Sequence, residues 1–153
     1  MKVLMVCLGN ICRSPMAEGI LRSKAAQRKI YLEVDSAGTG NYHSGEHPDP
    51  RAIATAKKFN VDISKQIARQ FAQADFDFYD FIFVMDHSNY SNVIRLAASE
   101  EHRKKVSLML SNWPESPLEE VPDPWFGGPE GFIDVFKMLD KACDCFLNEH
   151  FSN

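Results

Sequence analysis

A cysteine and an arginine near the start of the chain are separated by five residues, a spacing that suits phosphate chemistry. The segment reads Cys7-Leu8-Gly9-Asn10-Ile11-Cys12-Arg13-Ser14-Pro15, and an unbroken apolar run precedes it. A loop of this length can turn several backbone N–H groups toward one centre, at the positive end of the dipole of a following helix. We therefore expect a cradle for a tetrahedral dianion.

The side chains of this segment have distinct predicted tasks. Arg13 offers a planar fork that can grip two phosphate oxygens. Cys7 would lie at the floor of the cradle, where the amides, the dipole and Arg13 favour the thiolate, a nucleophile in line with phosphorus. Ser14 can donate its hydroxyl to the sulfur. Gly9 permits backbone angles barred to most residues, and Asn10 tolerates left-handed geometry while its side chain bonds the loop.

The cysteines admit other interpretations. A cysteine that ends a buried strand is usually a small core residue. The spacing from Cys7 to Arg13, Ser14 and Pro15 at a junction between a strand and a helix favours instead a thiolate that binds phosphate. Cys12 is either a packing residue at the helix start or a thiol close enough to Cys7 for a reversible disulfide. We interpret Cys143 and Cys145 as structural.

A carboxylate late in the chain is the candidate proton donor. Phosphoryl transfer from a phenol needs a proton for the leaving oxygen and then a base for water, and one carboxylate can serve in both roles. Asp123 lies between Pro122 and Pro124, and this string could also be a simple turn. Trp125 and Phe126 follow and can wall an apolar slot, which favours the functional interpretation.

None of the histidines has metal-ligand spacing, and we expect no metal site.

Alternating strands and helices must position these groups. We expect strands at 3–6, within 30–37, at 81–85 and at 106–110. We expect a first helix that begins with Ser14 as its cap, a second over 50–59 with Asp49 as its cap, and a third capped by Ser64. A fourth helix should begin at Ser88 or Asn89 and include Val93, Leu96 and Ala97. A fifth should run from Phe132 to the C-terminal region. Such alternation predicts an α/β fold with a mainly parallel sheet, three layers deep. Ligands of these sheets bind beyond the carboxyl ends of the strands, where the loops 7–14, 38–50 and 111–131 meet. Asp86 is expected to cap a helix.

The length and net charge of the chain limit the number of domains and the kinds of partner it can have. The chain has 153 residues and a net charge of −4, which fits a single domain, residues 1–153, without general attraction for nucleic acid or anionic lipid. The apolar run at 3–8 is too short for a bilayer span. Four cysteines clustered at the two ends are no disulfide framework, so we expect a cytoplasmic protein with no membrane partner.

The motifs of the chain resemble those of the low-molecular-weight protein tyrosine phosphatases. The likeness joins residues 7–15 to Val121-Pro122-Asp123-Pro124-Trp125, and extends to the strings at 35–38, 48–52, 68–70 and 85–89. It implies a four-stranded parallel sheet flanked by helices, no cofactor, and hydrolysis of phosphotyrosine proteins and small aryl phosphates through a cysteinyl-phosphate intermediate. It implies Cys7 as nucleophile, Arg13 as phosphate clamp and Asp123 as general acid and then base. The residues it implies for holding the loop are Asn10, Ser14 and Ser36, and those for the phenol slot are Leu8, Ile11, Tyr42 and Trp125.

Two departures from the family pattern are informative. Animal members have a tyrosine pair after the Asp-Pro, and here Trp125 and Phe126 replace it, which removes a phosphorylation site but keeps an aromatic wall. The related arginine phosphatases have Thr where this chain has Ile11, and an apolar residue there favours a tyrosine substrate.

A thiol-dependent arsenate reductase would need further cysteines within 86–105, and there are none. A phosphate-binding module would need neither the nucleophile nor the acid. We expect a monomer, with weak self-association as the alternative.

Overall fold

The computed structural model describes residues 1–126 and 128–151, apart from the Phe126 side chain. Four parallel strands form one sheet in the order β2-β1-β3-β4. They are β1 (Lys2–Cys7), β2 (Glu33–Gly38), β3 (Phe81–Val84) and β4 (Val106–Leu108). Because β1 is covered on both faces, its residues from Val3 to Val6 are all apolar and fully buried. The predicted four-stranded parallel sheet is thus confirmed.

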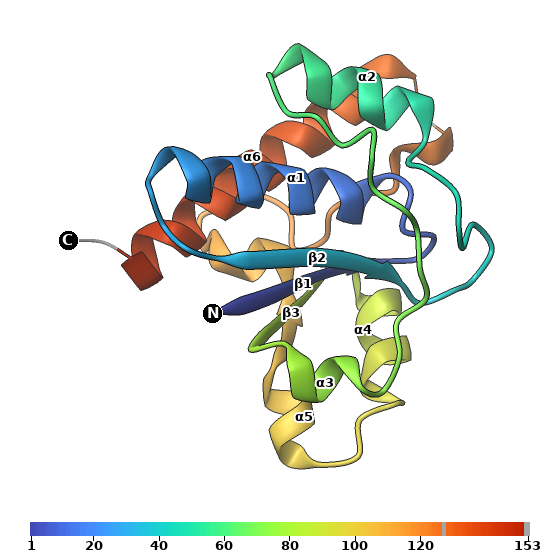
Figure 1. The fold of residues 1–153 in the computed structure, drawn as a ribbon, viewed down its shortest axis with the longest axis vertical. Coiled ribbons are helices and arrows are strands. Elements are labelled where there is room, and N and C mark those ends of the chain that lie inside the picture. Colours follow the sequence, from blue (N-terminus) through green and yellow to red (C-terminus); the bar gives the residue numbers. More distant parts are fainter. Residues whose placement is uncertain (127, 152–153) are drawn as a thin grey trace.

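Helices cover both faces of the sheet and make three layers (Figure 1). The helices α1 (Arg13–Gln27), α2 (Pro50–Lys58) and α6 (Pro129–Phe151) lie on one side. The shorter helices α3 (Asp75–Phe78), α4 (His87–Ile94) and α5 (Glu100–Lys104) lie on the other. Each side buries its own hydrophobic cluster against the sheet, and alternate residues of β1 point to opposite clusters: Met5 to the α1 side, Leu4 to the α3 side.

Several predicted helix boundaries need correction. The first helix begins at Arg13 with Cys12 in the cap position, because the Ser14 hydroxyl is engaged with Cys7 and Asn10 instead of a cap bond. Ser64 caps no helix: its N–H and hydroxyl both donate to Asp62 in a local turn.

The segments after β3 also differ from expectation. Asp86 caps α4 as predicted, but the helix begins at His87 and ends at Ile94, so Leu96 and Ala97 lie beyond it. The helices α3 and α5 were not predicted, since four and five residues carry little periodic signal.

The fourth strand and the long loop after it are also subdivided. Instead of reaching 110, β4 ends at Leu108 and passes into the 3-10 helix η1 (Met109–Asn112). The predicted loop 111–131 contains a second 3-10 helix, η2 (Pro124–Phe126), and the start of α6 at Pro129. Within the described ranges, no helix has the length and apolar character that a membrane span requires.

Candidate active site

The loop from Cys7 to Arg13 joins the carboxyl end of β1 to the first turn of α1. Cys7 is buried, and its Sγ accepts the Asn10 N–H at 3.3 Å. The Ser14 Oγ lies 3.0 Å from the same sulfur. Two polar hydrogens therefore lie where they can stabilise a negative charge on Cys7, which is what a nucleophilic thiolate requires.

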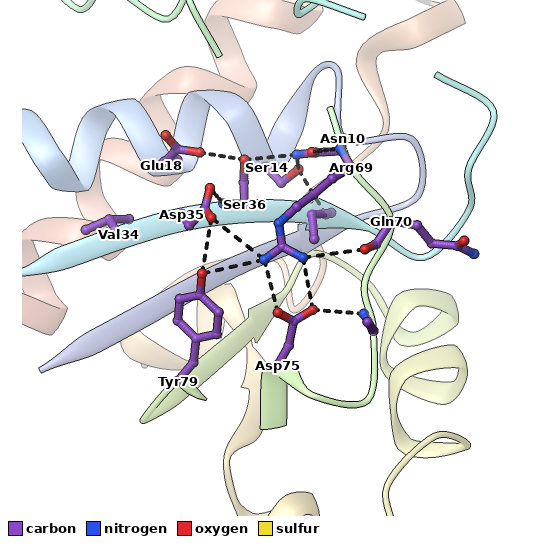
Figure 2. Close-up of polar contacts among 12 residues, drawn as sticks. Asn10, Ser14, Glu18, Val34, Asp35, Ser36, Arg69, Gln70, Asp75 and Tyr79 are labelled. Carbon is purple, nitrogen blue, oxygen red and sulfur yellow. Dashed lines mark hydrogen bonds and ion pairs between the residues drawn. The ribbon is translucent and has the colours of Figure 1, made fainter. Parts of the chain in front are cut away.

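Asn10 holds the loop from the inside, as Figure 2 shows. Its backbone is left-handed, with φ of 57°, a conformation that asparagine tolerates better than most residues. The side-chain Nδ2 donates to Ser14 Oγ at 2.8 Å and to Ser36 Oγ at 2.9 Å, and Oδ1 accepts the Arg69 N–H at 3.0 Å. The amide of Asn10 thus joins α1, β2 and the segment before α3.

A buried carboxylate lies behind Ser36. The Ser36 hydroxyl donates to Glu18 Oε1 at 2.6 Å, and Arg22 forms an ion pair with Glu18 Oε2 at 2.9 Å. Burial raises the pKa of Glu18, and the contacts with Ser36 and Arg22 oppose that rise only in part. Glu18 was not predicted, because in sequence it is an ordinary polar residue of a helix.

Arg69 is fixed by a polar cluster beneath the sheet edge (Figure 2). Its guanidinium bonds both carboxylate oxygens of Asp75 at 3.1 Å, and it lies 3.7 Å from Asp35 Oδ2. The Tyr79 hydroxyl donates to Asp35 Oδ2 at 3.1 Å, and burial together with the negative charge of Asp35 raises the pKa of Tyr79 to about 12. The Arg69 N–H that reaches Asn10 therefore belongs to a well-anchored residue.

The end of β2 lies directly against the outside of the cradle loop. The Thr39 N–H donates to Cys7 O and the Gly40 N–H to Leu8 O, both at 2.9 Å. A Cβ at Gly38 would lie 2.7 Å from Leu8 O and 3.1 Å from Asn10 N. Only glycine leaves room for so close a backbone approach.

Arg13 is buried and held by two acceptors. Its Nη1 donates to Asp86 Oδ2 at 2.7 Å and to Val121 O at 2.9 Å. Burial on its own lowers the pKa of Arg13, but the neighbouring Cys7 and Asp86 more than compensate and raise it. Asp86 was predicted only as a helix cap. Asp86 follows the central strand β3 at the same sheet edge as the cradle, and this position could have indicated a second role in the site.

Asp123 lines the same cleft as Cys7 and lies beside Arg13. Its Oδ2 is 3.9 Å from Arg13 Nη2, and its Oδ1 accepts the Trp125 N–H at 3.0 Å. The side chain is 43% exposed, so it can exchange protons with solvent. The pair of contacts orients one carboxylate oxygen toward the guanidinium and the other toward its own loop.

These groups share one cleft of about 290 Å³. It is lined by Cys7, Leu8, Gly9, Ile11, Cys12, Arg13, Tyr42, His43, Asp123 and Trp125. The predicted slot residues Leu8, Ile11, Tyr42 and Trp125 are therefore together, whereas the Phe126 side chain is outside the described part of the chain. His43 was not predicted: its ring packs over Gly9, with its centroid 6.0 Å from that of Trp125.

The remaining predicted residues lie at the wall or behind it. Asn10, Ser14 and Ser36 do not line the cleft but support the loop from behind. Cys12 does line it, and burial, aided by nearby Asp49, raises its pKa, so this thiol stays protonated. Across the described residues, no cluster of three metal-ligating side chains occurs.

The chain is similar over almost its whole length to known phosphatases. A family model described as low molecular weight phosphotyrosine protein phosphatase matches residues 2–152. The phosphatase of that name from Schizosaccharomyces pombe is 41% identical over 149 residues, which cover 95% of this chain and 94% of the yeast protein. A crystal structure of a protein tyrosine phosphatase from Entamoeba histolytica, with Hepes in its active site, superposes with a TM-score of 0.93 at 35% identity, covering 97% of this chain and 96% of that one.

A Drosophila arginine phosphatase has the same fold, with a TM-score of 0.93 at 32% identity, covering 100% of this chain and 99% of that one. The family match and the relatives give the class of the protein, a cysteine-dependent protein tyrosine phosphatase. Within that class the chain belongs to the low molecular weight phosphotyrosine protein phosphatase family. The predicted family is therefore confirmed.

Proposed function

We propose that this phosphatase works through a phosphocysteine on Cys7, with Arg13 as phosphate clamp and Asp123 as proton donor and acceptor. The observation that carries the proposal is the shared cleft. It has a sulfur with two polar hydrogens at its floor, a buried guanidinium beside it and an exposed carboxylate 3.9 Å from that guanidinium. This arrangement has a nucleophile, a clamp and an acid in the positions that phosphomonoester cleavage needs.

In the first step the Cys7 thiolate attacks phosphorus opposite the phenol oxygen. The S–P bond forms as the P–O bond breaks, and protonated Asp123 gives its proton to the departing phenolate. The loop amides and Arg13 stabilise the charge on the transferring phosphoryl group.

In the second step Asp123, now a carboxylate, takes a proton from a water molecule that attacks phosphorus. The new O–P bond forms as the S–P bond breaks, and inorganic phosphate leaves. The Ser14 hydroxyl, 3.0 Å from the sulfur, donates to the departing thiolate of Cys7 and makes it a better leaving group.

The walls of the cleft support phosphotyrosine as the preferred residue. Leu8, Ile11 and Trp125 present apolar surface along the path to Cys7, and Tyr42 adds a mostly exposed ring at the rim. Such a slot binds a phenyl ring and offers no acceptor from Ile11 for the N–H groups of a phosphorylated guanidinium.

All four cysteines are free thiols, and a nucleophilic thiol is best kept in a reducing compartment, so we place the enzyme in the cytoplasm.

The test is phosphate release from phosphotyrosine, phosphoserine and phosphoarginine peptides in metal-free buffer with chelator. Wild type, Cys7→Ser and Asp123→Asn are run together. We expect release from phosphotyrosine, none with Cys7→Ser, and a kcat/KM lowered by about 10²–10⁴-fold with Asp123→Asn. Acid quenching followed by peptide mass spectrometry should find a phosphoryl group on Cys7. Preference for phosphoarginine would refute the substrate assignment, and phosphate on another residue would refute the nucleophile.

A further inference from the structure

Asp123 lies midway between two backbone carbonyls that are each held by an arginine. Two residues before it, Val121 O accepts from Arg13 Nη1 at 2.9 Å. Two residues after it, Trp125 O accepts from Arg51 Nη1 at 3.0 Å. The first arginine belongs to the cradle itself. The second comes from the start of α2 and does not line the cleft.

Arg51 is itself tied to the cradle loop. Its Nε and Nη2 bond the two carboxylate oxygens of Asp49, at 3.1 and 2.9 Å. The Asp49 side chain is buried, and the Asp49 N–H donates to Ile11 O at 2.8 Å. A short series of contacts thus runs from the cradle backbone through Asp49 and Arg51 to the loop that carries Asp123.

The guanidinium of Arg51 also packs against aromatic rings. Its Cζ lies 5.1 Å from the ring centroid of Trp125 and 4.8 Å from that of Phe132 on α6. Contacts of a cation with two ring faces add to the hydrogen bond and restrict the Trp125 side chain as well as its carbonyl. Arg51 therefore fixes both the backbone and the ring two residues from Asp123.

We propose that Arg51 is a positioning residue for the general acid: it holds the 121–126 loop so that Asp123 reaches the leaving oxygen. This inference rests on the proposed role of Asp123. Loss of Arg51 should impair proton delivery to the phenolate, while attack by Cys7 should continue, because the bond from the Asp49 N–H to Ile11 O is a backbone bond that does not use the Arg51 side chain. A misplacement of about 1 Å is enough to cost about 10²-fold in a proton-transfer step.

The test compares two leaving groups. Tyrosine, with a phenol pKa of about 10, needs a proton to leave, whereas 2,4-dinitrophenol is so much more acidic that it leaves as the phenolate without one. Values of kcat/KM, which cover the steps up to phenol release, are measured for a phosphotyrosine peptide and for 2,4-dinitrophenyl phosphate. The variants are Arg51→Gln, Arg51→Lys, Asp123→Asn and, as control, Arg103→Gln. Arg103 on α5 has a side chain 44% exposed, as has Arg51.

We expect Arg51→Gln to lower kcat/KM for phosphotyrosine by about 10- to 100-fold and for the dinitrophenyl ester by less than about twofold. Arg51→Lys keeps the cation but cannot bond to Asp49 and to Trp125 O at the same time, so it should lower kcat/KM for phosphotyrosine to an intermediate extent. Arg103→Gln should match wild type with both esters. Equal losses on both esters in Arg51→Gln and Arg51→Lys would mean a merely structural role, and wild-type values would mean none; either overturns the inference. Should Asp123→Asn itself fail to distinguish the esters, the proposed function fails instead.

Discussion

Glu18 and Ser36 are joined by a 2.6 Å hydrogen bond at the far end of a series of bonds that leads to Cys7. Because Ser36 gives its only hydroxyl hydrogen to the carboxylate, its oxygen is left as acceptor for the Asn10 amide. The other Nδ2 hydrogen of Asn10 goes to Ser14, so the Ser14 hydrogen can point to the sulfur at 3.0 Å or to Ala37 O at 3.5 Å. A series of bonds thus connects a carboxylate outside the cleft to the serine that contacts Cys7.

Replacing Glu18 by glutamine should disturb this order. A glutamine can turn its amide N–H toward Ser36, reverse that bond and compete with the Asn10 donor. We expect Glu18→Gln to lower kcat/KM for a phosphotyrosine peptide by about tenfold, equivalent to about 1.4 kcal/mol. Glu149→Gln on the exposed face of α6 is the control. Wild-type kinetics in Glu18→Gln would show that the hydroxyl directions are set without this carboxylate.

The raised pKa of Glu18 also predicts how stability depends on pH. Between the ordinary glutamic acid pKa of about 4.3 and the raised folded value, the folded protein keeps a proton that the unfolded chain has released. Unfolding then releases a proton, so the contribution of Glu18 to stability falls as pH rises through this window. Urea unfolding of wild type and Glu18→Gln at several pH values isolates this effect, because other groups cancel in the difference. A wild-type advantage that grows with pH across the window would contradict the prediction.

The contact between Gly38 and the cradle backbone predicts a selective loss of activity. A methyl group on Gly38 meets Leu8 O at 2.7 Å, and backbone cannot move away as a flexible side chain can. We expect Gly38→Ala to lower the free energy of unfolding by about 1–3 kcal/mol and kcat/KM by about 10- to 100-fold. Gly131→Ala, whose Cβ has its nearest contact at 3.8 Å, should leave both near wild type. Urea titration and steady-state kinetics give the two quantities.

Asp86 has two tasks that one pair of substitutions can separate. Asparagine is also a good helix cap, so Asp86→Asn should keep the bond to the Asn89 N–H and lose only the charge facing Arg13. We expect a loss of about 2 kcal/mol in unfolding free energy, because Arg13 is buried, together with weaker binding of inorganic phosphate as a competitive inhibitor. Ser99→Ala, which removes the cap of α5, should lower stability but leave the inhibition constant unchanged. Unaltered phosphate inhibition in Asp86→Asn would show that Arg13 is oriented without it.

Apart from the parallel sheet, which follows from the alternation of strands and helices, most features predicted correctly from sequence are local ones. The unbroken apolar run of β1 and the Asp49-Pro50 cap of α2 each depend on neighbours within a few residues. The loop from Cys7 to Arg13 is equally local, since its length between a strand and a helix already requires a tight turn. Ser14 was misassigned as a cap because residue type alone cannot tell whether a serine oxygen will accept a backbone N–H of the helix or bond to side chains of the neighbouring loop.

The residues that were missed make contacts across long stretches of chain. Arg13 meets Asp86 73 positions away, and Arg51 meets Trp125 74 positions away. Glu18 and His43 likewise become part of the site only when β2 and its following loop are folded against β1. Such pairs follow from strand order and loop path, neither of which periodicity or spacing in one sequence can reveal.

The separation between the cradle and its acid along the chain has a consequence for synthesis. Cys7 and Arg13 belong to one short loop, whereas Asp123 follows more than a hundred residues later. With Asp123 in its proposed role, a chain emerging from the ribosome presents Cys7 and Arg13 well before the residue that is to protonate the leaving group and activate water. The residues that hold the cradle, among them Ser36, Arg69 and Asp86, also follow it in the chain, so the thiol gains its full set of neighbours only in stages, and the proposed acid comes last.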